Sequence, residues 1–267
     1  MTTATVTVAV CQFASVDDRA ANRERIAALV ARAAERGARL VVLPEYSSYF
    51  VDPMDETLAA NAEELDGAFT LSLRELADLH GVVIVAGLVE RADAERIRNT
   101  LVAVDGTGLL AVYRKQHLYD AFGQSESRWI EAGEVGAAAT FAVDGLAFGL
   151  MTCYDLRFPE VARTLVDAGA EALVVPAEWV RGPLKEHHWT TLLAARAIES
   201  TAYVVAADHP TPVGVGHSAV IDPQGVVIAG VGTGEGIAVA ELDAATVARV
   251  REVNPVLRLR RYRVVPR

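Results

Sequence analysis

The segment Gly149–Glu160 reads GLMTCYDLRFPE and changes from one kind of secondary structure to another within a few residues. An apolar strand ends at Cys153, and a helix is expected to begin about five residues later. This change is typical of an α/β fold, in which polar side chains at strand ends are exposed at the edge of a sheet.

The same alternation of strand and helix signals extends along the chain in both directions. We expect strands at about 5–13, 39–43, 82–89, 100–104, 109–113, 140–143, 146–151, 171–176 and 202–207. We expect helices around residues 26–34, 70–80, 158–168 and 185–200. Turn signals at 105–108, 144–145 and 222–225 predict hairpins, so the sheets should contain both parallel and antiparallel pairs. No linker is visible, and residues 1–267 are interpreted as one domain with a core at about 4–250 and a tail at about 251–267.

Composition excludes several classes of protein. Hydrophobic residues make up 52% of the chain and charged residues 22%, which argues against disorder. A formal net charge of −10 argues against nucleic-acid and anionic-membrane partners. No apolar run approaches the roughly 18 residues that span a bilayer, so no membrane partner is expected. With only two cysteines and no signal-peptide pattern, we expect a cytoplasmic protein.

Cys153 is the first candidate for chemistry. A nucleophile at a strand end before a helix is exposed at the sheet edge, and nearby backbone N–H groups can stabilise an oxyanion. The alternative is a buried structural cysteine, which is common. Cys11 lies inside a predicted strand, so we interpret it as a core residue.

A nucleophilic thiol needs a base, and six histidines leave a Cys–His enzyme open as an alternative. Other polar residues also follow strands. Glu45 comes directly after an apolar strand and could act as a base, while Lys115 follows another strand and could stabilise an oxyanion. Glu126 offers a second carboxylate in the next loop. His187 and His188 are adjacent rather than four residues apart, so no metal site is expected.

Taken together, these segments resemble the nitrilase (carbon–nitrogen hydrolase) superfamily, which uses a Glu-Lys-Cys triad. The matching segments are LPE at 43–45, RKQHLYD at 114–120 and TCYDLRFPE at 152–160, separated by similar spacings. The resemblance covers about residues 4–260. It implies a four-layer α-β-β-α sandwich, an amidase that hydrolyses a small carboxylate-bearing amide through a cysteine thioester, and no cofactor.

Finer features are similar to the Nit-type branch of this superfamily. The segment WVRGPLKEHHW at 179–189 resembles the bacterial deaminated glutathione amidases, which makes deaminated glutathione the expected substrate. An ω-amidase acting on 2-oxoglutaramate or succinamate is the alternative, and a non-enzymatic ligand-binding relative is a third. The resemblance also implies a homodimer or higher homo-oligomer formed through helices near the cysteine.

The resemblance assigns roles to individual residues. Glu45 would be the base, Lys115 and the Tyr154 backbone N–H would hold the oxyanion, and Glu126 would position the substrate or Lys115. Arg181 and Lys185 are candidates for binding the substrate, because a carboxylate in the acyl group needs a cationic partner. Trp179 and Tyr154 could form a wall of the substrate pocket, or could equally be core residues. We interpret Arg157 as structural and paired with Asp155 or Glu160.

Overall fold

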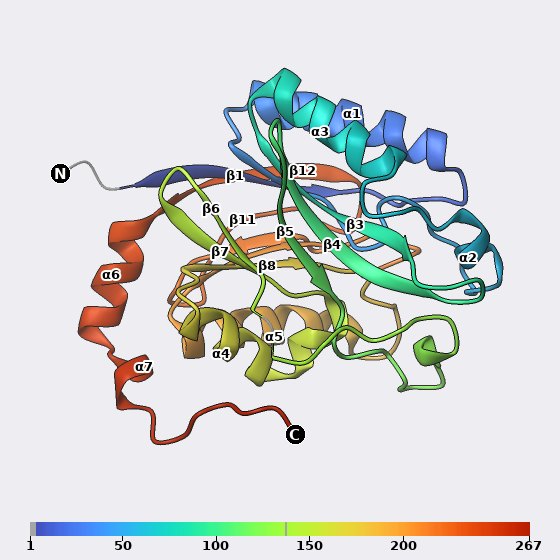
Figure 1. Ribbon diagram of the computed structural model, residues 1–267. Coiled ribbons are helices and arrows are strands. Elements are labelled where there is room, and N and C mark those ends of the chain that lie inside the picture. The colour runs from blue at the N-terminus through green and yellow to red at the C-terminus, as the bar shows by residue number, and fades with distance from the viewer. Residues whose placement is uncertain (1–3, 137) are drawn as a thin grey trace.

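The computed structural model describes residues 4–136 and 138–267, which form two six-stranded sheets packed face to face (Figure 1). The first sheet has the order β12–β1–β2–β3–β4–β5. Its strands are β1 (Thr5–Gln12), β2 (Leu40–Val42), β3 (Val83–Arg91), β4 (Ile97–Asp105), β5 (Gly108–Arg114) and β12 (Gly236–Asp243). The second sheet has the order β11–β10–β9–β8–β7–β6. Its strands are β6 (Thr140–Val143), β7 (Leu146–Leu150), β8 (Ala172–Pro176), β9 (Tyr203–Ala207), β10 (Ala219–Ile221) and β11 (Val227–Gly230).

Helices cover the outer face of each sheet and complete the four layers (Figure 1). Helices α1 (Arg19–Glu35) and α3 (Ala68–His80) lie on the first sheet, and α4 (Pro159–Asp167) and α5 (Lys185–Ser200) lie on the second. The remaining helices are α2 (Thr57–Asn61), α6 (Ala244–Val253) and α7 (Val256–Leu259). The predicted α-β-β-α sandwich is therefore confirmed. None of the helices in the described part of the chain is long and apolar enough to cross a membrane.

Each sheet is mixed, as the hairpin signals predicted. β1, β2 and β3 run parallel, whereas β12, β4 and β5 pair antiparallel with their neighbours. In the second sheet β7, β8 and β9 run parallel. Because parallel strands of one sheet end at the same edge, the segments that follow β7, β8 and β9 leave the second sheet on one side.

Strand β1 shows how the sequence pattern produces the layers. Val8 and Val10 pack into the core between the two sheets, whereas Ala9 and Cys11 pack under α1 and α3. This alternation follows from the two-residue period of a strand. Cys11 is fully buried, as expected for a core residue, and burial raises the pKa of its thiol to about 12.

Helix ends follow local sequence signals. Asp18 caps α1, because its carboxylate accepts hydrogen bonds from the backbone N–H groups of Ala20 and Ala21. Pro159 occupies the first turn of α4, where no backbone N–H is needed. Gly81 ends α3 in the left-handed conformation, with φ +64°.

Two parts of the fold were not predicted from the sequence. Strand β12 pairs with β1 over eight residues, although its apolar run at 237–240 was not predicted to be a strand. Helix α6 and the short α2 and α7 were also missed. Each has few buried residues, so the apolar periodicity that reveals a helix is weak there.

Gly87 of β3 lies against the chain segment that follows β2. A Cβ atom at this position would be 2.3 Å from the backbone nitrogen of Tyr46 and 2.7 Å from the carbonyl carbon of Glu45. Backbone atoms cannot move aside as a flexible side chain can. The absence of a side chain at residue 87 therefore sets how closely this segment approaches the sheet.

Candidate active site

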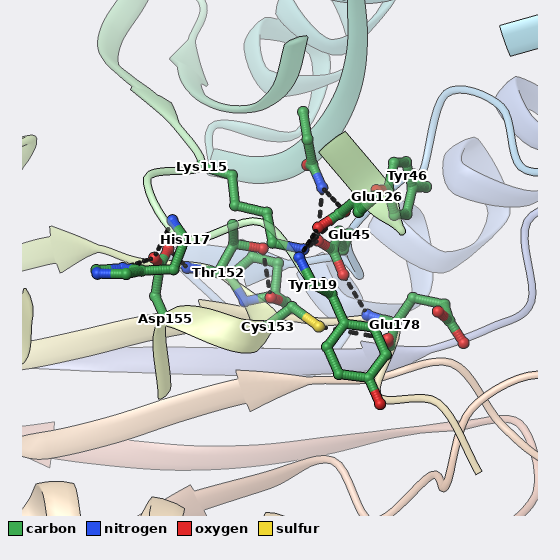
Figure 2. Close-up of polar contacts among 12 residues, drawn as sticks. Glu45, Tyr46, Lys115, His117, Tyr119, Glu126, Thr152, Cys153, Asp155 and Glu178 are labelled. Atoms are coloured by element: carbon green, nitrogen blue, oxygen red, sulfur yellow. Dashed lines mark hydrogen bonds and ion pairs between the residues drawn. The ribbon is translucent and has the colours of Figure 1, made fainter. Parts of the chain in front are cut away.

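Ionisable side chains converge at the carboxyl ends of strands β2, β5 and β7. Glu45 comes shortly after β2, Lys115 follows β5 directly, and Cys153 comes shortly after β7. Glu126 begins a short 3-10 helix in the loop between β5 and β6. All four residues line one cavity of about 280 Å³, and Figure 2 shows them side by side. The structure thus brings together the four residues proposed from the sequence as catalytic.

The ammonium group of Lys115 is buried between two carboxylates. Its Nζ atom donates hydrogen bonds to Glu45 Oε1 at 3.0 Å and to Glu126 Oε1 at 2.8 Å, and only 2% of the side chain is exposed. Burial by itself lowers the pKa of Lys115, but the charges of Glu126 and Glu45 outweigh it and raise the pKa well above its usual value. Lys115 is therefore a fixed cation that can stabilise a developing oxyanion.

The carboxylate of Glu45 is fully buried and held by three donors. Oε1 accepts from Lys115 and from Asn99 Nδ2 at 2.6 Å, and Oε2 accepts from the backbone N–H of Glu178 at 2.7 Å. Burial raises the pKa of Glu45, and the charge of Lys115 offsets this only in part. A carboxylate with a raised pKa accepts a proton more readily, which suits a general base.

Glu126 fixes Lys115 from the opposite side. Its Oε1 atom also accepts from the Tyr46 hydroxyl at 2.5 Å, and its Oε2 atom accepts from the Tyr119 backbone N–H at 2.5 Å. Glu126 therefore links the Lys115 ammonium to the Tyr46 hydroxyl and to the backbone of Tyr119.

The Cys153 thiol faces the same cavity from a strained backbone. The residue has φ +46°, in the left-handed region that residues other than glycine rarely adopt. Its Sγ atom donates to the carbonyl oxygen of Glu178 at 3.3 Å. Burial first, and then the charge of Glu45, raise the pKa of Cys153 well above its usual value. The thiol is therefore protonated at neutral pH, and a base must take its proton before it can attack.

Asp155 holds the strained turn in place. Its carboxylate accepts from the Thr152 backbone N–H at 3.2 Å, from the Tyr113 hydroxyl at 2.7 Å and from the His117 backbone N–H at 3.1 Å. Together with Thr152 it forms a capping box around the 3-10 helix that starts at Cys153. Positive-φ backbone persists only where the surroundings over-determine it, and this network supplies that constraint.

Asp208 anchors the loop that contacts both Glu45 and Cys153. Its carboxylate accepts hydrogen bonds from the backbone N–H groups of Trp179 at 2.7 Å, Val215 at 3.1 Å and Gly216 at 3.0 Å. Trp179 follows Glu178, whose backbone makes the two contacts described above. Asp208 therefore positions the site through the main chain.

The four residues expected to bind the substrate are not all in the same place. Tyr154, Trp179 and Lys185 line a narrow cavity beside Cys153. Arg181 is exposed and lines neither this cavity nor the larger one.

Arg157 joins the narrow cavity instead of making the expected ion pair. Among the described residues it forms no salt bridge with Asp155 or Glu160, so that expectation was wrong. Its guanidinium lies over the ring of Trp179 at 4.9 Å and over that of Phe122 at 5.6 Å. Arg157 packs against aromatic rings near the 3-10 helix instead of pairing with the nearby carboxylates.

Lys185 is the second cation of the narrow cavity. Its Nζ atom contacts the Tyr119 hydroxyl and lies 4.1 Å from the centre of the Phe122 ring. Burial, followed by the charge of Arg157, lowers the pKa of Lys185. Among the residues that the structure describes, neither Arg157 nor Lys185 pairs with a carboxylate, so both charges are available to an anionic group.

The six histidines do not line the two cavities that contain Cys153, and this disfavours a Cys–His pair. His209 packs behind the site with its Nε2 atom 2.8 Å from the carbonyl oxygen of Glu45, and His117 stacks on Phe158. Over residues 4–136 and 138–267, no cluster of His, Cys, Asp and Glu is suited to hold a metal ion.

Three residues that contribute to the site were not predicted from the sequence, although two of them follow a recognisable sequence signal. Asp208 and Glu178 both come just after apolar strands, which is the same signal that identified Glu45. Asn99 lies within strand β4 between Arg98 and Thr100, and nothing in the sequence distinguishes it from a polar residue facing solvent.

Comparisons with known proteins agree with this geometry. A family model described as carbon-nitrogen hydrolase matches residues 7–252. A deaminated glutathione amidase from Escherichia coli O157:H7 is 43% identical over 255 residues, covering 96% of this chain and 97% of the relative. Yeast Nit3, described as a member of branch 10 of the nitrilase superfamily, is 28% identical with a TM-score of 0.84, covering 97% of each chain. A variant of an amidase from Nesterenkonia sp. AN1 is 28% identical with a TM-score of 0.82, covering 96% of this chain and 94% of that one, and shows covalent addition of the acetamide moiety of fluoroacetamide at its active-site cysteine.

We predict that Lys115→Met destabilises the protein in a pH-dependent way. Without the ammonium group, Glu45 and Glu126 face each other as buried, uncompensated charges, which costs about 3–5 kcal/mol. Burial already raises the pKa of Glu45, and the variant removes the Lys115 charge that offsets this rise. The folded-state pKa of Glu45 then lies above its unfolded value, so stability is retained in acid and lost as the pH rises. Urea unfolding should show a larger defect at pH 8 than at pH 5.5.

Arg39→Met is the matched control for this prediction. Arg39 pairs with Asp144 on the surface, where such a pair contributes about 0–1 kcal/mol. An equal loss of stability for both variants, or a Lys115→Met defect independent of pH, would contradict the assigned charge balance.

Proposed function

Because the chain belongs to the carbon–nitrogen hydrolase family, we propose that Glu45, Lys115 and Cys153 form the catalytic triad of this amidase. The observation that carries the proposal is the shared cavity, in which a base, a cation and a thiol face the same space. Glu126 acts by holding Lys115.

The first half of the reaction forms a thioester. Glu45 takes the thiol proton while the Cys153 sulfur bonds to the amide carbonyl carbon. The resulting oxyanion is held by the Lys115 ammonium and by the Tyr154 backbone N–H, which has no acceptor inside its helix because it lies in the first turn. The carbon–nitrogen bond then breaks, Glu45 returns the proton to the leaving nitrogen, and the amine departs.

The second half releases the acid. Glu45 takes a proton from water, and the hydroxide adds to the thioester carbonyl. The carbon–sulfur bond breaks and the proton returns to Cys153. Each proton that Glu45 accepts is delivered again within the same half reaction, so the fixed charges around it need not change.

We propose that the substrate is deaminated glutathione. This follows from the name of the Escherichia coli relative, together with the basic lining of the narrow cavity. The acyl group of that substrate ends in a carboxylate, and Lys185 and Arg157 supply the two cations beside Cys153. The expected cytoplasmic location stays a prediction.

We predict that Cys153→Ala lowers kcat by a factor of about 10⁴ or more, because no thioester can form. With deaminated glutathione, the wild type should release 2-oxoglutarate and Cys-Gly, measured by chromatography. Mass spectrometry of a quenched reaction should show the acyl group on Cys153. Cys11→Ala is the control, because Cys11 lies under the helices of the first sheet. This substitution should leave formation of the acyl adduct on Cys153 unchanged.

Two outcomes would contradict this assignment. Substantial activity in Cys153→Ala would remove the proposed nucleophile. Release of ammonia from 2-oxoglutaramate without release of Cys-Gly from deaminated glutathione would favour an ω-amidase and retain the triad.

We predict that Lys185→Met selectively impairs substrates with an acyl carboxylate. A charge-assisted hydrogen bond contributes about 1.5–3 kcal/mol, so the ratio of kcat/KM for succinamate to that for butyramide should fall about tenfold or more. Arg181→Met is the matched control, because Arg181 lies outside both cavities. A larger fall for Arg181→Met would reverse the assignment.

We propose, as the family resemblance implied, that the protein forms a homodimer. Support comes from large apolar side chains exposed near the C-terminus, Leu259, Tyr262 and Val265, and from a groove of about 680 Å³ between α4 and residues 264–267. Sedimentation equilibrium at micromolar concentration should give twice the chain mass of 28.5 kDa. A species at the chain mass alone would exclude the dimer.

A further inference from the structure

Cys153 lies between two cavities, of which the narrow one is lined by more basic than acidic side chains and the larger one by more acidic than basic side chains. The narrow one contains Arg157 and Lys185, and the larger one contains Glu45 and Lys115. Since Glu45 gives its proton to the leaving nitrogen, the leaving group departs on the side of the larger cavity. The acyl carboxylate then lies on the basic side, and this inference rests on the function proposed above.

Glu178 lies in the wall shared by the two cavities, and its carboxyl group has no assigned role. Its backbone N–H binds Glu45 and its backbone oxygen binds Cys153, so the residue is fixed at the reacting centre. Only 7% of the residue is exposed, yet within the described ranges no hydrogen bond is formed by its carboxyl group. Figure 2 shows this group extending away from the Cys153 sulfur.

The carboxyl oxygens of Glu178 are not among the fully buried polar atoms that lack a partner, so a ligand in the cavity can reach them and donate a hydrogen bond. Burial first, and then the charges of Asp208 and Glu45, raise the pKa of Glu178 well above its usual value. A neutral carboxyl group repels a leaving group that ends in a carboxylate less than an ionised one does. Its carbonyl oxygen remains an acceptor in either state. Arg128 lines the same cavity and can face that terminal carboxylate.

We propose that Glu178 recognises the leaving group, with its carboxyl oxygen accepting a hydrogen bond from the peptide N–H one residue beyond the scissile bond. Amides that release a peptide carry this donor, whereas a primary amide that releases ammonia does not. Glu178 therefore selects peptide amides over primary amides at a site whose triad can hydrolyse both.

The test compares deaminated glutathione with its analogue in which sarcosine replaces glycine, so that only the peptide N–H is replaced by N–CH₃. For the wild type we expect kcat/KM to be about tenfold lower or more for the analogue, because the buried acceptor is left unpaired. Glu178→Ala should reduce this difference to less than threefold. Glu178→Gln keeps an acceptor oxygen and should preserve it, as should Glu241→Ala, an exposed control on β12.

The possible results separate the two levels of the argument. If the wild type hydrolyses both peptide substrates equally, Glu178 does not read the N–H and the inference fails, whatever the variants do. A difference that persists in Glu178→Ala would assign it to the bulk of the methyl group and would also overturn the inference. In both cases release of Cys-Gly by the wild type leaves the proposed function standing. Hydrolysis of 2-oxoglutaramate without release of Cys-Gly would overturn both.

Discussion

The buried ammonium group of Lys115 is the constraint on which the rest of the site depends. A single cation inside a protein is costly unless opposite charge and hydrogen bonds surround it, and Glu45 and Glu126 provide both. Burial first, and then the charge of Glu45, raise the pKa of Cys153 and keep its thiol protonated, while the Lys115 charge opposes this rise. The arrangement proposed to stabilise the oxyanion therefore also requires a general base.

The main chain of the loop after β8 connects Glu45, the proposed base, to Cys153, the proposed nucleophile. One residue, Glu178, donates to Glu45 through its N–H and accepts from Cys153 through its carbonyl oxygen. Asp208 then fixes the next residue, Trp179. Main-chain contacts vary little with side-chain rotamers, so the relative positions of base and nucleophile are set by the fold itself.

Much of this arrangement could be predicted from the sequence, for a definite physical reason. Glu45, Lys115 and Cys153 each come just after apolar strands, and strand ends in an α/β sheet meet at one edge. Arg157 could not be placed in this way, because the choice between Asp155 and the ring of Trp179 depends on packing across the cavity. Arg181 and Lys185 are four residues apart in the segment after β8, and the sequence does not distinguish their burial. Lys185 begins helix α5 and is buried, whereas Arg181 precedes the helix and is exposed. Strand β12 was missed, although the sheet that positions Glu45 begins with it.

The geometry of the site depends on Gly87, although Gly87 is not among the residues that line the cavity. It contributes no functional group, yet the close approach of β3 to the backbone of Glu45 and Tyr46 requires that nothing larger than hydrogen occupy its α-carbon. A methyl group at this position would displace the backbone of Glu45, the proposed general base. A residue without any functional group therefore limits which substitutions the site can tolerate.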